Sequence, residues 1–188
     1  FCLPDADSAK EAEHYLDQKI AECDSVGGVV ECVISGLPTG LGEPVFEKLD
    51  ANLAKAILSI GAVKGFEIRD GFAATKACGS ENNDEFRMDG DKIVKETNHA
   101  GGVLGGISDG SDVIFRAAFK PTPSIAKSQE TVTKDGENID LVIHGRHDPV
   151  VVPRAVVVVE SMAAITAMDM LLMSMTSRLD LIQMFFQV

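Results

Sequence analysis

The stretch DVIFRAAFK, residues 112–120, decides the fold, because apolar side chains fall on every second position and alternate with Arg116 and Lys120. This period of two is typical of a β-strand with one buried face. The run NIDLVIH, residues 138–144, alternates in the same way. A pair of such strands favours an antiparallel sheet with one face covered. The buried positions of the first strand are expected to be Val113, Phe115, Ala117 and Phe119.

Toward the N-terminus, helices and a strand alternate. Apolar residues spaced by three and four predict an amphipathic helix over Ser8–Asp24, with a capping box formed by Ser8 and Glu11. A strand is expected over Val29–Ser35, and a loop rich in Gly and Pro follows at 36–44. A second helix comes next, and its apolar residues share one side: Leu49, Leu53, Ala56, Ile57 and Ile60.

A short strand at Phe66–Arg69 is followed by a long polar and acidic segment at about 75–99. A segment of this length is too long for a tight connection, so it is interpreted as a functional flap or a mobile excursion. Apart from this flap, residues 1–188 are expected to form a single domain.

The C-terminal third combines two tendencies. Residues Val150–Val159 are rich in β-branched side chains that favour a strand, whereas Ser161–Leu181 is rich in Met, Leu and Ala and favours a helix. The helix has no polar stripe, so it is expected to be enclosed on most sides. A membrane span is disfavoured because Glu160 and Asp169 lie within the apolar segment.

Composition and charge exclude several classes of protein. With 17 basic and 29 acidic residues the formal charge is −12, which disfavours nucleic acid as a partner. The first residues, Phe1 to Pro4, lack the pattern of a signal peptide. The four cysteines have no CxxC spacing and are expected as packed thiols in a reducing compartment, cytoplasmic or organellar: Cys2, Cys23, Cys32 and Cys78.

Three short segments carry groups capable of chemistry. Arg146-His147-Asp148 follows a predicted strand, and a carboxylate between cations is held ionised, which suits a general base or simply a structural Arg–Asp pair. Lys120-Pro121-Thr122-Pro123-Ser124 places a cation and two hydroxyls at a strand end, where they suit a phosphate-bearing ligand or a turn without one. The glycines at 101–106 permit close approach of a ligand, or a tightly packed turn beside His99, and they lack dinucleotide spacing. His144 and His147 lack further ligands at suitable spacing, so a metal is disfavoured.

Taken in order, these stretches resemble chorismate synthase, and the resemblance covers nearly the whole chain. The chain is similar to the C-terminal half of that family, whose complete members are roughly twice as long. The matching blocks are DSVGGVVE (24–31), GLPTGLG (36–42), KLDA (48–51), AVKG (62–65), NHAGG (98–102), LGGIS (104–108), KPTPSI (120–125) and RHDP (146–149), continued through Ala155 to Met162.

The resemblance implies an α+β fold with helices sandwiched between antiparallel sheets, a homotetramer, and a role in the shikimate pathway of aromatic amino-acid biosynthesis. The family eliminates phosphate from 5-enolpyruvylshikimate 3-phosphate to give chorismate, with reduced FMN as cofactor. Asp148 is implied in proton transfer at the flavin. Implied FMN contacts are Gly61, Ala62, Gly105, Lys120, Pro121, Thr122, Pro123, Ser124 and Arg146.

The resemblance leaves alternative functions open. The family's catalytic histidines lie in the half that has no counterpart here, so His99 and His147 do not take those roles, and the chain alone is expected to be inactive and to expose apolar surface or self-associate. The chain is therefore also compatible with a non-catalytic FMN-binding or assembly domain. A different flavoprotein, catalysing net oxidation or reduction, is the third interpretation.

Overall fold

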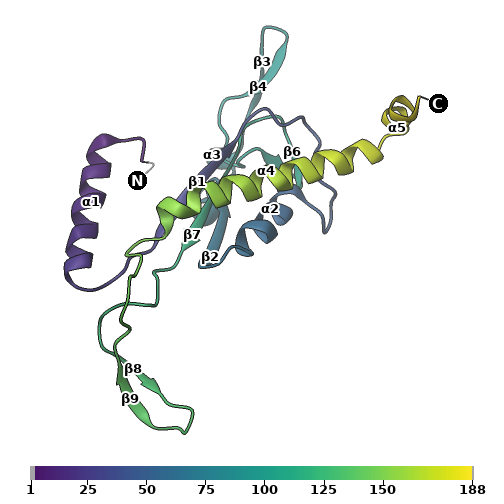
Figure 1. Ribbon diagram of the computed structural model, residues 1–188. Helices are drawn as coiled ribbons and strands as arrows, with labels where there is room; N and C mark the ends of the chain where they lie inside the picture. Colours follow the sequence, from purple (N-terminus) through teal and green to yellow (C-terminus); the bar gives the residue numbers. More distant parts are fainter. Residues whose placement is uncertain (1–2, 188) are drawn as a thin grey trace. The chain divides into compact units, whose positions relative to one another are not determined.

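The computed structural model describes residues 3–187 (Figure 1). The chain divides into two compact units, and each is described by itself. The first unit comprises Phe1–Val30 and Ala118–Val156, and the second comprises Glu31–Ala117 and Val157–Val188. The expectation that residues 1–188 form one domain stays a prediction.

A three-stranded sheet has the order β1-β7-β2, and most of its residues belong to the second unit. The central strand β7 (Val113–Phe119) has Val113, Phe115 and Ala117 fully buried, which confirms the alternation at 112–120. Its neighbours are β1 (Gly28–Ile34) and β2 (Val63–Ile68), and both predicted strands are therefore present. The Phe115 ring stacks on Phe66 with a centroid distance of 5.2 Å.

Two helices cover the core of this unit. The first is α2 (Leu49–Leu58), which buries Leu49, Leu53 and Ile57 completely, as the apolar spacing predicts. The second is the part of α4 (Val152–Thr176) that belongs to this unit. Residues of both helices line one surface cavity, so α2 and α4 lie side by side (Figure 1). A short amphipathic helix, α5 (Leu179–Phe186), ends the described chain.

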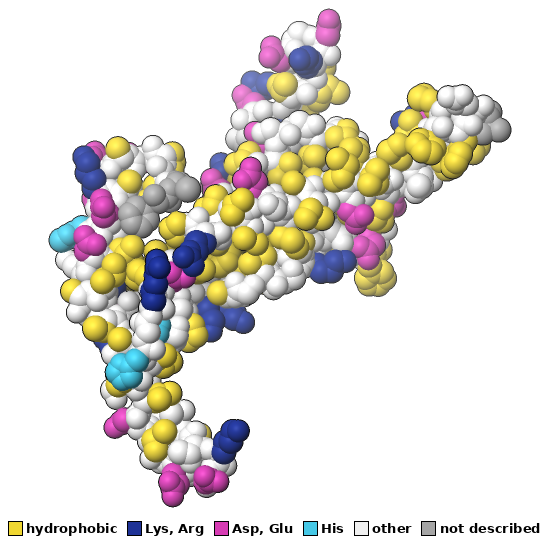
Figure 2. All heavy atoms as spheres, viewed as in Figure 1, with side chains coloured by type: hydrophobic (Ala, Val, Ile, Leu, Met, Phe, Trp, Pro, Cys, Tyr) yellow, Lys and Arg dark blue, Asp and Glu magenta, His cyan; other side chains and the backbone are white. Residues whose placement is uncertain are grey.

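The composition of Val150–Val159 left strand and helix open, and the segment is helical from Val152, where α4 begins. Pro153 suits the first turn of a helix, and the helical cost of β-branched residues is small enough for packing to override it. The expectation of an enclosed helix is wrong. Val157 is 60% and Ile165 is 62% exposed, and apolar side chains are visible along the helix in Figure 2.

The length and composition of α4 would allow it to cross a membrane. One such helix is weak support for a membrane protein, because the core helix of a soluble protein passes the same test. The charged groups Glu160 and Asp169 lie within this helix, which makes a span costly.

The first unit contains α1 (Ala6–Ala21) and an antiparallel hairpin. The predicted capping box of Ser8 and Glu11 is wrong, because Asp5 caps the helix and its side chain accepts a hydrogen bond from the Ser8 N–H at 2.7 Å. The helix also ends earlier than predicted, three residues before Asp24. The strand expected at 138–144 is shorter than predicted. It forms β9 (Asn138–Leu141), which pairs with β8 (Gln129–Val132).

The polar flap of the second unit contains regular structure, and two short hairpins follow the sheet strand β2 (Figure 1). The glycine run at 101–106 shapes the second hairpin. This mixture of helices and small antiparallel ladders confirms the α+β class. The elements of the region are η1 (Gly71–Lys76), α3 (Gly79–Asn82), β3 (Phe86–Asp89), β4 (Lys92–Lys95), β5 (Val103–Leu104) and β6 (Ile107–Ser108).

Candidate functional site

In the first unit, three segments distant in sequence meet around Asp148. The Ser25 hydroxyl donates a hydrogen bond to the Thr122 carbonyl at 2.6 Å. The Val26 N–H donates to the Pro149 carbonyl at 2.8 Å. A β-carbon at Gly27 would lie 2.3 Å from the Phe119 carbonyl oxygen, so only glycine permits this approach. The segments at 24–27, 119–127 and 147–150 are therefore held together.

These segments surround a cavity of about 310 Å³. Asp148 and His147 lie in its lining, beside Ile125 and Ala126 from the segment after β7. The His147 Nε2 atom lies 3.0 Å from the Ile143 carbonyl oxygen, so this ring position is used in a structural hydrogen bond. The arrangement places two acidic residues, Asp148 and Asp24, in the lining of a small, mostly apolar cavity.

The partner of Asp148 differs from the one expected. Its Oδ2 atom accepts a hydrogen bond from Arg154 Nη1 at 2.7 Å, whereas Arg146 is exposed and has no ion pair with the described residues. The reason is that Arg154 lies on the first turn of α4, and the chain turns back between Asp148 and this helix. The prediction that Arg146 holds Asp148 is wrong, and Arg154 supplies that charge.

Three exposed cations in the described part of this unit have no carboxylate partner. They are Lys120, directly after β7, Lys134 and Arg146. Lys127 differs, because it lies 2.6 Å from Asp24. The hydrogen bond from Lys127, followed by that from the Ser25 N–H, lowers the pKa of Asp24. Lys120 and Arg146 are therefore two of the three cations in this unit that are free to bind an anionic ligand.

The remaining predicted ligand contacts lie in the second unit and expose backbone. Gly105 is exposed at the tip of the β5–β6 hairpin with a φ of +61°, and no atom lies within 4 Å of where its β-carbon would be. Gly61 is similarly open, and Ala62 has a φ of +71°. These three positions allow a flat ligand to contact the backbone closely.

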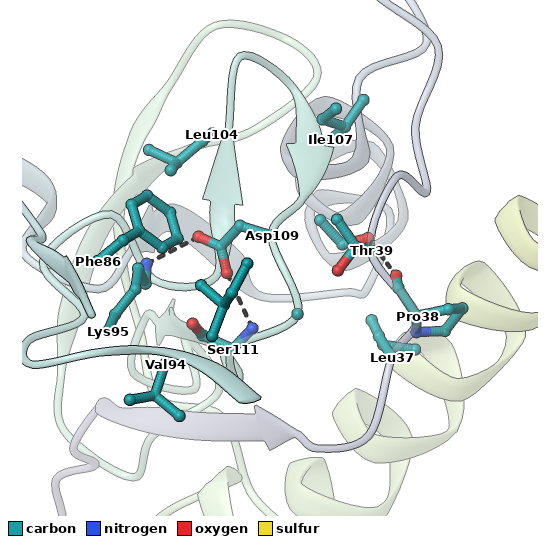
Figure 3. A pocket seen from close by; sticks show the side chains of 13 residues that line it. Leu37, Pro38, Thr39, Phe86, Val94, Lys95, Leu104, Ile107, Asp109 and Ser111 are labelled. Atoms are coloured by element: carbon teal, nitrogen blue, oxygen red, sulfur yellow. Dashed lines mark hydrogen bonds and ion pairs between the residues drawn. The ribbon is translucent and has the colours of Figure 1, made fainter. Parts of the chain in front are cut away.

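A cavity of about 940 Å³ lies beside the β5–β6 hairpin (Figure 3). Leu104 and Ile107 of this hairpin and Phe86 of β3 contribute apolar walls, and the ion pair of Lys95 with Asp109 lies in the lining. A volume of this size suits a small-molecule ligand. Within the stretch 101–106, Leu104 lines this cavity and the glycines do not.

Sequence reasoning missed the buried charges of the flap. The side chains of Lys95 and Asp84 are each 3% exposed, and that of Asp109 is 7% exposed. Burial alone would raise the pKa of Asp84, but hydrogen bonds from the Ala100 N–H, Thr97 Oγ1, the His99 N–H and Lys95 outweigh it and hold this pKa far below its usual value. The polar composition was the only available signal, and it is equally typical of a solvated loop.

Two other sequence expectations have a clear outcome. His99 Nδ1 lies 2.7 Å from Asp70 Oδ2, which places this histidine in a structural pair at the end of β2. The cysteines were expected to be packed, but Cys23 and Cys78 are exposed and Cys32 is half-buried. Cys2 lies outside the described residues.

The predicted residues thus fall into two sets. Lys120 to Ser124, Arg146 and Asp148 belong to the first unit, and Gly61, Ala62 and Gly105 belong to the second. By their helices and small antiparallel ladders, the units define a protein of the α+β class.

The chain belongs to the chorismate synthase family, whose family model matches residues 1–172. It is 62% identical over 188 residues to the chorismate synthase of Lachnoclostridium phytofermentans, covering 100% of this chain and 51% of the relative. It is 64% identical over 185 residues to that of Agathobacter rectalis, covering 98% and 50%. The chain therefore spans about half the length of these curated relatives.

A solved structure supports the same assignment. The fold is similar to a crystal structure of chorismate synthase with a TM-score of 0.75 and 32% sequence identity, covering 92% of this chain and 45% of that one. The family resemblance and the chorismate synthase-like fold predicted from the sequence are both confirmed.

Proposed function

We propose that this chain is the C-terminal part of a chorismate synthase, a phosphate lyase that converts 5-enolpyruvylshikimate 3-phosphate to chorismate by 1,4-anti elimination. The observation that carries the proposal is the family match over residues 1–172, together with a carboxylate and two unpaired cations at the expected positions. The complete protein is a cytoplasmic, or organellar, homotetramer. The single-domain organisation of residues 1–188 belongs to the same proposal.

The donor set of the chain fits FMN. Lys120 and Arg146 are exposed cations able to bind its phosphate, and the amides and hydroxyls of residues 121–124 supply further donors. Gly61, Ala62 and Gly105 have backbone open to a flat ring. Reduced FMN, when bound, supplies an electron-rich ring that assists the departure of phosphate and is not consumed overall.

Asp148 is the residue of this chain that we assign to proton transfer. Arg154 donates a hydrogen bond to its Oδ2 atom, while Oδ1 has no hydrogen-bond donor among the described residues. An ionised carboxylate with one free oxygen at the edge of a cavity accepts a proton readily. The side chain of Asp148 is 38% exposed, so this oxygen can be reached from the cavity.

A full-length chimera tests the assignment, with this chain replacing the matching half of the Lachnoclostridium phytofermentans relative. Formation of chorismate is followed with reduced FMN and exclusion of oxygen. Asp148→Asn is expected to lower kcat by about 100-fold or more, the effect of losing one acid–base group, with the Kd for FMN unchanged. Asp140→Asn on the exposed strand β9 is the matched control. Full activity of the Asp148 variant would remove this residue from the mechanism.

The second function that we propose, for the 188 residues taken alone, is that of a non-catalytic FMN-binding or assembly domain. The 188-residue chain is expected to form no chorismate by itself. Turnover by the isolated chain would contradict that expectation and exclude the second function.

A further inference from the structure

The buried ammonium group of Lys95 joins three segments of the second unit. Its Nζ atom lies 2.7 Å from Asp109 Oδ2, 3.1 Å from Asn98 Oδ1 and 3.3 Å from Asp84 Oδ2. Three acceptors match the three protons of an ammonium group, so the cation is fully satisfied despite its burial. Lys95 is the last residue of β4, so the contacts tie the flap to the chain that follows it.

Asp84 holds the backbone turn that follows β4. Its Oδ1 atom accepts hydrogen bonds from Thr97 Oγ1 and the His99 N–H, both at 2.7 Å. Its Oδ2 atom accepts one from the Ala100 N–H at 3.0 Å. These bonds specify the backbone of residues 97–100, which leads directly into the glycine run.

Asn98 and Asp109 hold the two ends of the β5–β6 hairpin. Asn98 Oδ1 accepts a hydrogen bond from the Gly102 N–H at 2.8 Å, directly before β5. Asp109 follows β6, and its N–H donates to the Gly102 carbonyl at 3.0 Å. Lys95 binds both of these side chains, so it joins the two ends of the hairpin.

The hairpin is very short, and Lys95 adds to main-chain hydrogen bonds that tie its β6 side to residues 40, 41 and 49. It contains only two residue pairs, Val103 with Ser108 and Leu104 with Ile107. Two pairs do not hold a hairpin in a single conformation in water. Gly105 lies at its tip and adopts a positive φ of 61°.

We propose that Lys95 is a positioning residue for the flavin site, holding the β5–β6 hairpin so that Gly105 presents its backbone to the cofactor. The inference rests on the proposed function, because it requires FMN to contact Gly105. Without the ammonium group, the buried carboxylates of Asp84 and Asp109 lose the cation between them, and water must enter to solvate them. The β5 end of the hairpin, where Asn98 and Asp109 bind Gly102, then becomes more mobile, and Gly105 is held less firmly.

The test compares Lys95→Met with Arg87→Met in the full-length chimera. Arg87 is a matched control because it is a cation of the same flap, but its ion pair with Glu96 is exposed. Hydrogen exchange is measured without flavin at the backbone N–H groups of Gly102 and Asp109. The Kd for FMN is measured by flavin fluorescence. The temperature is one at which each variant is fully folded, as established by urea denaturation.

Lys95→Met is expected to speed exchange at Gly102 and Asp109 by about tenfold or more, because local opening loses the bonds that oppose it. It is also expected to raise the Kd for FMN by about tenfold, since the hairpin must be ordered again on binding. Arg87→Met is expected to change both by less than about twofold. If Lys95→Met does not fold, Asp109→Asn replaces it, with smaller changes in the same direction.

The outcomes separate the inference from the proposed function. A chimera that binds FMN equally well with and without Lys95 would overturn the inference and leave the proposed function intact. Unchanged exchange at Gly102 and Asp109 would also overturn it. A chimera with Lys95 present that binds no FMN would overturn the proposed function, and the flavin role of Lys95 with it.

Discussion

Replacing Asp84 by asparagine is expected to destabilise the second unit more than any exposed charge substitution. The carboxylate is 3% exposed and accepts hydrogen bonds from four donors, among them Lys95 and two backbone N–H groups. An amide of the same size can accept at only one of its two terminal atoms, so donors that now bind Oδ1 or Oδ2 would face an NH₂ group. Asp84→Asn also leaves Lys95 with one fewer anion.

The magnitude follows from the number of bonds lost. A hydrogen bond to a charged group contributes about 1.5–3 kcal/mol, and removing one partner of a buried ion pair costs about 3–5 kcal/mol. We therefore expect Asp84→Asn to lower the free energy of unfolding of the chain by about 3–5 kcal/mol in urea denaturation at pH 7. Asp140→Asn, at an exposed position on β9, is the control, and its effect is expected to stay within about 0.5 kcal/mol.

The same substitution predicts a change in pH dependence. The pKa of Asp84 is lower in the folded chain than in the unfolded chain, where it is about 3.9. Its contribution to stability is therefore complete above the unfolded pKa and is lost as the pH falls below it toward the folded pKa. Below about pH 3.9 the free energy of unfolding should fall by up to about 1.4 kcal/mol more per pH unit in the wild type than in Asp84→Asn.

Two results would refute this reasoning. A loss below about 1 kcal/mol at pH 7 would mean that the buried network contributes no more than one ordinary hydrogen bond. Parallel acid profiles for the wild type and Asp84→Asn would mean that Asp84 does not titrate differently in the folded and unfolded chains.

Two further substitutions test the neighbouring loops by urea denaturation. Ser108→Ala removes a fully buried hydroxyl that donates to the Pro38 carbonyl at 2.6 Å, with an expected loss of about 1–3 kcal/mol; an unchanged midpoint would contradict it. Gly106→Ala places a β-carbon 2.4 Å from Lys48 Cγ and should cost more stability than Gly105→Ala, which has open space. The reverse order would contradict the packing described for this hairpin, since both glycines have a positive φ.

The strands could be predicted from sequence where the pattern is local and one face is buried. The alternation at 112–120 determines which side chains of β7 are buried, and the structure agrees residue by residue. The segment at 150–159 shows the limit of this reasoning, because its β-branched residues favour a strand on their own. Packing of Val159, which is fully buried, and a proline in the first turn make it part of α4 instead.

The identities of the site residues were easier to predict than their partners. A short motif such as Arg146-His147-Asp148 places ionisable groups in one loop, and the loop indeed lies at the edge of a cavity. Adjacent residues in a chain, however, often point in different directions, so closeness in sequence does not identify an ion pair. The chain turns after Asp148, and the first turn of α4 brings Arg154 to it.

The flap shows why a polar composition is a poor guide to order. Acidic and polar residues between 75 and 99 predict exposure when each is considered separately, because burial of one charge is costly. Burial becomes favourable only when several groups satisfy one another, and here Lys95, Asp84 and Asp109 come from positions 11 and 14 residues apart. No local sequence pattern predicts that arrangement. The shape of the Gly105 hairpin can thus depend on charges that, from the sequence alone, are typical of an ordinary solvated segment.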